Sequence, residues 1–281
     1  MNNIYTLKHS LRPGFEPVLK LIVETTQKTG TPFFVAGATA RDLVLFHVFG
    51  RDPGRQTRDI DTGILLPNWD VFKEVKKALI QTGLTEANNN AHRLIHSSGL
   101  PVDIIPFGTI ADENGEIQWP PEHQITMSVA GFQEAYDASL LVDIGDGIII
   151  KVASLAGLTL LKLIAWQERA DMNDKDATDF LTILLEYQHL QLDRLWEDFI
   201  PAEALEYDLE RQAAFLLGYD LNGILSQADS STHTINQIKL VKADQDNRLL
   251  RSMLKNPSAH DTDKISLLLQ DFWMGLKLNE L

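Results

Sequence analysis

Cysteine is absent from this chain of 281 residues, so neither a disulfide nor a thiolate metal site can hold the fold or carry out chemistry. The chain also lacks any run of the roughly 20 apolar residues that a membrane span needs. Its richest apolar stretch, residues 152–166, is shorter and contains Lys162. The first residues, MNNIYTLKHSLRPGF, have no apolar core of the kind found in signal peptides. We therefore expect a soluble, cytoplasmic protein.

Basic residues are scarce relative to acidic ones. The chain has 25 Lys and Arg against 39 Asp and Glu, which gives a formal net charge of -14. This balance counts against a general nucleic-acid binder, because contact with phosphate backbones favours basic surfaces. It leaves a nucleotide substrate open, since metal ions and a few cations can hold phosphates locally. Hydrophobic residues make up 44% of the chain, which is ordinary for a globular protein with a full core.

The pattern of apolar residues changes near residue 153. Before it, short apolar runs predict strands at 33–36, 58–66, 92–96, 100–107, 140–144 and 147–152, and amphipathic stretches predict helices at 15–28, 38–49 and 68–81. After Ser154, nearly every stretch has a helical period. The sequence therefore predicts an α/β domain in residues 1–153 and a helical domain in residues 154–281.

Two carboxylates stand two residues apart in the extended stretch around Asp59, Ile60 and Asp61. Side chains alternate along a strand, so both aspartates should lie on one face while Ile60 turns to the core. Two neighbouring carboxylates repel each other, and protonating one of them is costly at neutral pH. A divalent cation relieves this repulsion, and a few hard oxygen ligands completed by water and phosphate suit Mg²⁺.

A third carboxylate, Asp103, lies among apolar neighbours in the strand predicted at 100–107. If this strand adjoins the strand of Asp59 and Asp61, three carboxylates converge. Three such ligands can hold two ions for an in-line phosphoryl displacement, with Asp103 as the candidate base for the attacking hydroxyl.

The Asp59–Asp61 pair alone leaves several alternatives open. It is compatible with an exposed strand end, a glycosyltransferase or a phosphatase of the haloacid dehalogenase type. The phosphatase pattern requires threonine two places after the second aspartate, and here that place holds Gly63, with Thr62 one position early. This mismatch disfavours the phosphatase.

A glycine turn precedes the carboxylate pair by about 20 residues. Gly37 ends a predicted strand and allows a sharp turn that a larger side chain would block. Free N–H groups at the start of the next helix then favour an anion. The hydroxyl of Thr39 and the charge of Arg41 would complete a small triphosphate cradle. The alternative is a plain strand–helix turn, but the carboxylates on the next strand favour the cradle.

The residues of these two motifs resemble the nucleotidyltransferases of the DNA polymerase β-like superfamily. The branch most similar to this chain is the AbiEii/AbiGii toxin type, with a GGTAL-like turn and an RxTxDID-like strand, here residues 37–41 and 55–61. The chain departs from the family at Ala38, where the family prefers Gly or Ser. The resemblance implies the nucleotidyltransferase fold, a mixed sheet flanked by helices, with Gly37, Ala38, Thr39 and Arg41 at the nucleotide.

The helical half adds a lysine in an apolar stripe. Lys162, Trp166 and Arg169 share one helix face, and an ammonium there needs a partner, either a phosphate or a carboxylate. Asp176 and Asp179 open the next helix, where acids commonly balance the helix dipole. By resemblance to the KLxA and [RK]DxxD motifs of the toxin-type branch, Lys162 binds the triphosphate and Asp176 is an active-site acid. Asp179 is expected to brace Arg169 or Lys175.

The sequence therefore predicts a nucleotidyltransferase dependent on Mg²⁺ or Mn²⁺, with Asp59, Asp61 and Asp103 as metal ligands and Lys162 and Arg169 closing over the nucleotide. It would move NMP from an NTP to an acceptor hydroxyl and release pyrophosphate. The resemblance implies tRNA as acceptor and an antitoxin as partner, while a small molecule or a protein side chain remain open. Two alternatives are a non-catalytic nucleotide- or partner-binding module that keeps this fold, and a phosphatase.

Overall fold

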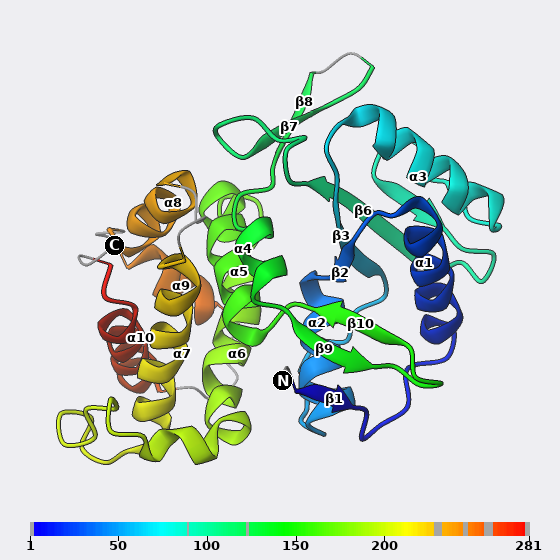
Figure 1. Ribbon diagram of the computed structural model, residues 1–281. Coiled ribbons are helices and arrows are strands. Elements are labelled where there is room, and N and C mark those ends of the chain that lie inside the picture. Colours follow the sequence, from blue (N-terminus) through cyan, green and yellow to red (C-terminus); the bar gives the residue numbers. More distant parts are fainter. Residues whose placement is uncertain are drawn as a thin grey trace. The chain divides into compact units, whose positions relative to one another are not determined.

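The computed structural model describes residues 3–88, 90–121, 124–227, 232–243, 247–255 and 261–278. The chain divides into two compact units, Met1–Ser154 and Leu155–Leu281. The first unit contains all the strands of the described residues, and the second is built from helices (Figure 1). This arrangement confirms the predicted fold class, a mixed sheet flanked by helices and followed by a helical region.

One sheet of eight strands forms the centre of the first unit. Its strand order is β1-β9-β10-β2-β3-β6-β5-β4, and a separate hairpin pairs β7 with β8. The strands are β1 (Ile4–Thr6), β2 (Phe33–Val35), β3 (Ile60–Leu65), β4 (Thr85–Glu86), β5 (Arg93–Ile95), β6 (Pro101–Phe107), β7 (Glu116–Trp119), β8 (Ile125–Ser128), β9 (Leu140–Asp143) and β10 (Ile149–Val152).

The pairing of β3 and β6 is the feature of the sheet that positions the acidic side chains. These strands run parallel, with Asp61 opposite Asp103, and β5 runs antiparallel to β6 on its other side. β3 begins at Ile60, so Asp59 lies just ahead of the strand that was predicted to start at residue 58. The strands predicted near β2, β5, β6, β9 and β10 are present, whereas β1 and the β7–β8 hairpin were not predicted.

The helices of the first unit are α1 (Phe15–Thr29), α2 (Gly37–Asp42), α3 (Trp69–Gln81) and α4 (Phe132–Asp137). A π-helical stretch, η1 (Leu43–Val48), continues directly from α2. The helix predicted at 38–49 is therefore α-helical in its first part and π-helical in its second. α1 and α3 pack against each other on one side of the sheet (Figure 1). They do so through apolar stripes, and their inner residues are fully buried.

An aromatic cluster explains the glycine inside β3. The rings of Phe34, Phe107, Phe132 and Tyr136 lie 5.5–6.1 Å apart in edge-on or tilted pairs. A Cβ atom at Gly63 would lie 2.3 Å from the ring of Phe34. Glycine therefore stands at this position because the core ring packs directly against the strand backbone.

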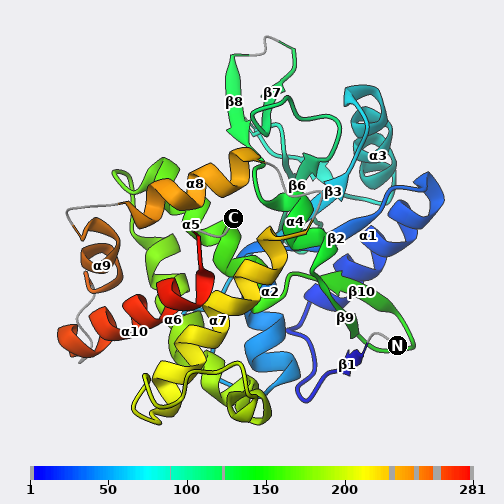
Figure 2. The ribbon, with the colours of Figure 1, turned by 60° about the vertical axis from the view of Figure 1, so that its left-hand side comes forward.

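The second unit contains α5 (Leu155–Arg169), α6 (Lys175–Leu190), η2 (Leu192–Trp196), α7 (Leu209–Leu225), α8 (Thr232–Lys242), α9 (Arg248–Met253) and α10 (Thr262–Leu276). α7 and α10 lie side by side (Figure 2), and their backbones approach closely. A Cβ atom at Gly218 would lie 2.0 Å from the carbonyl oxygen of Phe272, and one at Gly275 would lie 2.0 Å from that of Phe215. None of the helices in the described residues has the length and apolar character that a membrane crossing requires.

Candidate active site

Three carboxylates converge at the β3–β6 pair. Asp61 on β3 and Asp103 on β6 face each other in register, and Asp59 precedes β3 by one residue. One oxygen from each of Asp59, Asp61 and Asp103 lies within 4.8 Å of the others. Asp103 is 8% exposed, and the other two are half-buried. The convergence expected from adjacent strands is therefore present, and the three aspartates are positioned to bind a divalent cation.

Gly37 leaves room for the Asp61 carboxylate. Its φ of 58° lies in the left-handed region, which glycine adopts without strain. A Cβ atom at this position would lie 2.1 Å from Asp61 Oδ2. Two separate constraints therefore require glycine here, the backbone conformation of the turn and the close approach of the carboxylate.

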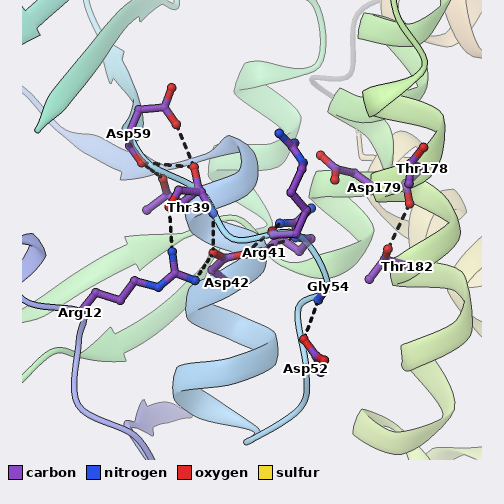
Figure 3. A network of polar contacts seen from close by, with 12 residues as sticks. Arg12, Thr39, Arg41, Asp42, Asp52, Gly54, Asp59, Thr178, Asp179 and Thr182 are labelled. Atoms are coloured by element: carbon purple, nitrogen blue, oxygen red, sulfur yellow. Dashed lines mark hydrogen bonds and ion pairs between the residues drawn. The ribbon is translucent and has the colours of Figure 1, made fainter. Parts of the chain in front are cut away.

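The hydroxyl of Thr39 ties the turn to the start of β3. Thr39 Oγ1 donates to the carbonyl oxygen of Asp59 at 2.7 Å (Figure 3). It also accepts from the backbone N–H of Asp61 at 3.3 Å. The side chain is 1% exposed. The single hydroxyl proton, which the sequence assigned to a phosphate, therefore has a backbone partner. Thr39 positions both carboxylate-bearing residues, and its contact with a nucleotide stays a prediction.

Arg41 belongs to a buried polar network beneath the turn. Its guanidinium donates to Asp42 Oδ1 at 2.9 Å and to the carbonyl oxygen of Arg55. Asp42 also accepts from Arg12 at 2.7 Å and from the backbone N–H of Thr57 at 3.1 Å (Figure 3). Arg41 is 1% exposed and the neighbouring Ala38 is buried as well. These contacts anchor α2 to the loop ahead of β3, while nucleotide binding by Ala38 and Arg41 stays a prediction.

Arg93 on β5 is a site residue that the sequence did not reveal. Its Nε donates to Asp103 Oδ1 at 2.7 Å, and its Nη2 donates to Asp103 Oδ2 at 2.6 Å and to Asp59 Oδ2 at 3.2 Å. The hydrogen bond with Asp103 raises the pKa of Arg93 more than burial lowers it. The signal for this residue was the short connection between the strands predicted at 92–96 and 100–107, which sets Arg93 opposite Asp103.

Lys162 has carboxylate partners within the second unit. Its Nζ lies 3.0 Å from Asp176 Oδ1 and 2.7 Å from Asp179 Oδ2, and Arg169 Nε lies 2.7 Å from Asp176 Oδ2. Burial lowers the pKa of Lys162, but Asp179 and Asp176 outweigh it and the net change is upward. Burial raises the pKa of Asp176, but Arg169 and Lys162 lower it by more.

Of the two partners considered for Lys162, the structure shows the carboxylates, and it pairs Asp179 with Lys162. Asp176 is 2% exposed at the start of α6. A direct role of Lys162, Arg169 or Asp176 in nucleotide binding or catalysis stays a prediction.

No known family model matches this chain, and no curated protein matches it by sequence. Solved structures with a similar arrangement include ANT(2")-Ia in complex with adenylyl-2"-tobramycin, at 14% identity over 63% of this chain and 90% of that one with a TM-score of 0.39. The lincosamide antibiotic adenylyltransferase LnuA is 16% identical over 60% of this chain and 95% of that one, with a TM-score of 0.37.

An antigenic nucleotidyltransferase-like protein from Paracoccidioides brasiliensis is also similar, at 15% identity over 78% of this chain and 98% of that one with a TM-score of 0.39. At 14–16% identity, the likeness to these structures is one of fold.

Proposed function

We propose that this chain is a divalent-metal-dependent nucleotidyltransferase, and the convergence of Asp59, Asp61 and Asp103 carries the proposal. The three carboxylates lie within 4.8 Å of one another, and Arg93 forms hydrogen bonds with two of them, Asp103 and Asp59. A group of hard oxygen donors of this kind suits Mg²⁺ or Mn²⁺. Along the chain, the glycine turn is followed by the two paired aspartates and then by the third aspartate. This is the order of motifs in the polymerase β-like superfamily that the sequence resembles.

In the proposed reaction, an acceptor hydroxyl attacks the α-phosphorus of an NTP and pyrophosphate leaves. A bound divalent cation would offset phosphate charge and lower the pKa of the attacking hydroxyl. Asp59 and Asp61 would hold the cation, Thr39 fixes their backbone and Gly37 gives Asp61 its space. Asp103, whose two oxygens accept hydrogen bonds from Arg93, would accept the hydroxyl proton.

We propose the residues that bind the nucleotide, and the kind of acceptor, from the resemblance to the superfamily. Gly37 and the following turn would face the triphosphate, and residues 1–153 would form the nucleotidyltransferase domain. By the same resemblance, Lys162 and Arg169 would bind the nucleotide and Asp176 would be an active-site acid, all three in the helical domain of residues 154–281. The acceptor proposed from the AbiEii/AbiGii branch is tRNA, with an antitoxin as partner protein; a small molecule or a protein side chain are the competing acceptors.

The phosphatase alternative is weakened by the core. The position that requires threonine in that family holds Gly63, and the ring of Phe34 fills the space of any side chain there. A phosphatase would also form a covalent aspartyl intermediate at Asp59, whose Oδ1 accepts a hydrogen bond from Thr57 at 2.8 Å and whose Oδ2 accepts one from Arg93.

The test is Mg²⁺-dependent pyrophosphate release from each of the four NTPs, with total tRNA or water as acceptor. We expect Asp61→Ala to lower the rate by at least ~100-fold, because several kcal/mol of transition-state stabilisation depend on the cation. Asp70→Ala is the matched control, since Asp70 is an exposed acid on α3 whose side chain pairs with Lys73, also exposed. Retained nucleotide binding without pyrophosphate release would favour the non-catalytic module, and phosphate release from simple esters would favour the phosphatase.

A further inference from the structure

A cavity of about 280 Å³ lies beside α3, and none of the three aspartates of the candidate site lines it. One wall is formed by α3, and the others come from β4, from the residues just ahead of β5 and from the end of β7. All of these elements belong to the first unit. We call this space the α3 cavity.

Three lysines line the α3 cavity, although the chain as a whole has a net charge of -14. Lys73, Lys76 and Lys77 stand at i, i+3 and i+4 of α3, so they share one helix face. The Nζ of Lys76 donates to the carbonyl oxygen of Ala91 at 3.0 Å and lies 2.8 Å from Glu86 Oε1. Lys76 is therefore fixed in the wall, and Glu86 is the only acid among the described residues that line the cavity.

The other two ammonium groups are available to an incoming anion. The side chain of Lys77 is exposed, and no described residue forms an ion pair or hydrogen bond with it. Lys73 pairs with Asp70 at 3.2 Å, but these two side chains are 65% and 88% exposed. An ion pair this exposed is weak, so a phosphate dianion can replace Asp70 as the partner of Lys73.

The rest of the wall is largely apolar and contains a buried donor without an acceptor. Ile80, which is 37% exposed, and Pro120 line the cavity together with Trp119. Trp119 is 4% exposed and packs against the rings of Trp69 and His92 at centroid distances of 5.2 and 5.5 Å. Its indole Nε1 has no hydrogen-bond partner in the described part of the chain. A buried donor of this kind is rare in native proteins, and a bound water or ligand is a common explanation.

We propose that the α3 cavity binds one nucleotide unit, with its phosphate at Lys73 and Lys77 and its ring against Ile80 and Pro120. Lysines bind phosphate as point charges, and an apolar wall with a few polar groups is typical of small-molecule sites. The volume is close to the lower limit of such sites, about 300 Å³, which suits a single unit. A free nucleotide and one residue of a nucleic-acid strand share this chemistry.

This inference goes beyond the proposed function, because it requires neither a divalent cation nor the three aspartates. The first test is therefore isothermal titration of the full-length protein with AMP in excess EDTA. We expect Lys77→Ala to weaken AMP binding at least ~10-fold, since a hydrogen bond to a charged group is worth about that factor or more. Lys28→Ala is the matched control and should bind like the wild type, because Lys28 is an exposed lysine in the last turn of α1 and does not line the cavity.

Single-stranded hexaadenylate in the same titration identifies the source of the nucleotide unit. Tighter binding than AMP, with the same loss in Lys77→Ala, assigns the cavity to a nucleic-acid strand. Binding no tighter than AMP assigns it to a free nucleotide. Inorganic phosphate that binds as tightly as AMP would overturn the proposal, because the ring would then contribute nothing.

The second test needs no substitution and follows the assigned ¹⁵N–¹H signal of the Trp119 indole. The chain has five tryptophans, and the other four indole signals serve as internal controls. Saturating AMP should shift the Trp119 signal most, because this residue is the tryptophan that lines the cavity among the described residues.

Three results would overturn the proposal: equal AMP affinity of Lys77→Ala and the wild type, no binding of either AMP or hexaadenylate, or a Trp119 signal that does not move with saturating AMP. Each would leave the proposed function standing, because pyrophosphate release is measured with metal and NTP present and depends on Asp61.

Discussion

Gly37→Ala, compared with Gly30→Ala, separates the backbone requirement of a glycine from its role beside a carboxylate. Both residues adopt nearly the same left-handed conformation, with φ of 58° at Gly37 and 66° at Gly30. An alanine in this region costs about 1–2 kcal/mol. At Gly30 no described atom lies within 4 Å of the added Cβ, whereas at Gly37 the Cβ would lie 2.1 Å from Asp61 Oδ2.

The two substitutions should therefore share a loss of stability and differ in function. We expect each to lower the free energy of unfolding in urea by about 1–2 kcal/mol, from the backbone term alone. Only Gly37→Ala must also displace the Asp61 carboxylate by roughly 1 Å, a shift that can cost ~100-fold in rate when it misplaces a reacting group. Its Mn²⁺ affinity and its pyrophosphate release should fall together.

The measurements are urea unfolding, a Mn²⁺ titration and pyrophosphate release for the wild type and both variants. Wild-type Mn²⁺ affinity in Gly37→Ala would refute the inference that Gly37 gives Asp61 its space. An equal loss of Mn²⁺ binding in Gly30→Ala would attribute the effect to general destabilisation.

Two further predictions concern the helical unit. Gly218→Ala should lower the free energy of unfolding by about 2–3 kcal/mol or more, because its Cβ would overlap a backbone carbonyl of α10; Gly223→Ala on the same helix, where the described surroundings are open, should raise it by about 0.5–1 kcal/mol. Thermal denaturation of both variants checks this pair, and equal effects would contradict it. Burial raises the pKa of Asp176, but Arg169 and Lys162 lower it by more, so that the pKa in the folded protein lies below 3.8. The stabilisation from its charge is therefore fully present above about pH 4 and is lost as the pH falls through the pKa of the folded protein. Asp176→Asn should therefore be less stable than the wild type by about 3 kcal/mol at pH 7, and a gap that persists undiminished at pH 2 would show that the charge is not the cause.

Apolar patterning was sufficient to predict the central strands and the order of the two regions. The strands β2, β3, β5 and β6 are continuous or alternating apolar runs bounded by turn residues, so local sequence determines them. β1 is different, since its three residues become a strand only by pairing with β9, 137 positions later. The β7 strand does alternate, with Ile117 and Trp119 buried, but Pro120 follows it directly, and proline is unfavourable within a sheet.

The acidic residues of the candidate site were predictable for a similar reason. Alternation along the predicted strand placed Asp59 and Asp61 on one face, and Asp103 was found among apolar neighbours in the next candidate strand, before any pairing was known. Arg93 escaped notice because an arginine in a strand has no preferred face until the register with β6 is fixed. The direction of the Thr39 hydroxyl was equally invisible, since either a phosphate or a carbonyl oxygen satisfies it and only the three-dimensional structure shows which is near.

The lysine of the helical unit shows where patterning reaches its limit. A cation in an apolar stripe requires an anionic partner, and the sequence offered both a phosphate and the aspartates of the following helix. In the structure, Lys162 forms ion pairs with Asp176 and Asp179, which are aspartates of that helix. The sequence could state that a partner was needed, but the partner's identity depends on how α5 packs against α6.

The parallel register of β3 and β6 makes the spacing of two carboxylates independent of the chain length between them. Asp61 and Asp103 meet because of the strand pairing, and the segment of residues 66–100 between the two strands contains α3, β4 and β5. An insertion at the turn around Gly83, where the described surroundings are open, would therefore leave the two carboxylates in place. A slip of one residue between the strands would instead set Val102 or Ile104 opposite Asp61 and turn Asp103 to the other face. The acidic group thus tolerates changes of length in the connection but no change of register.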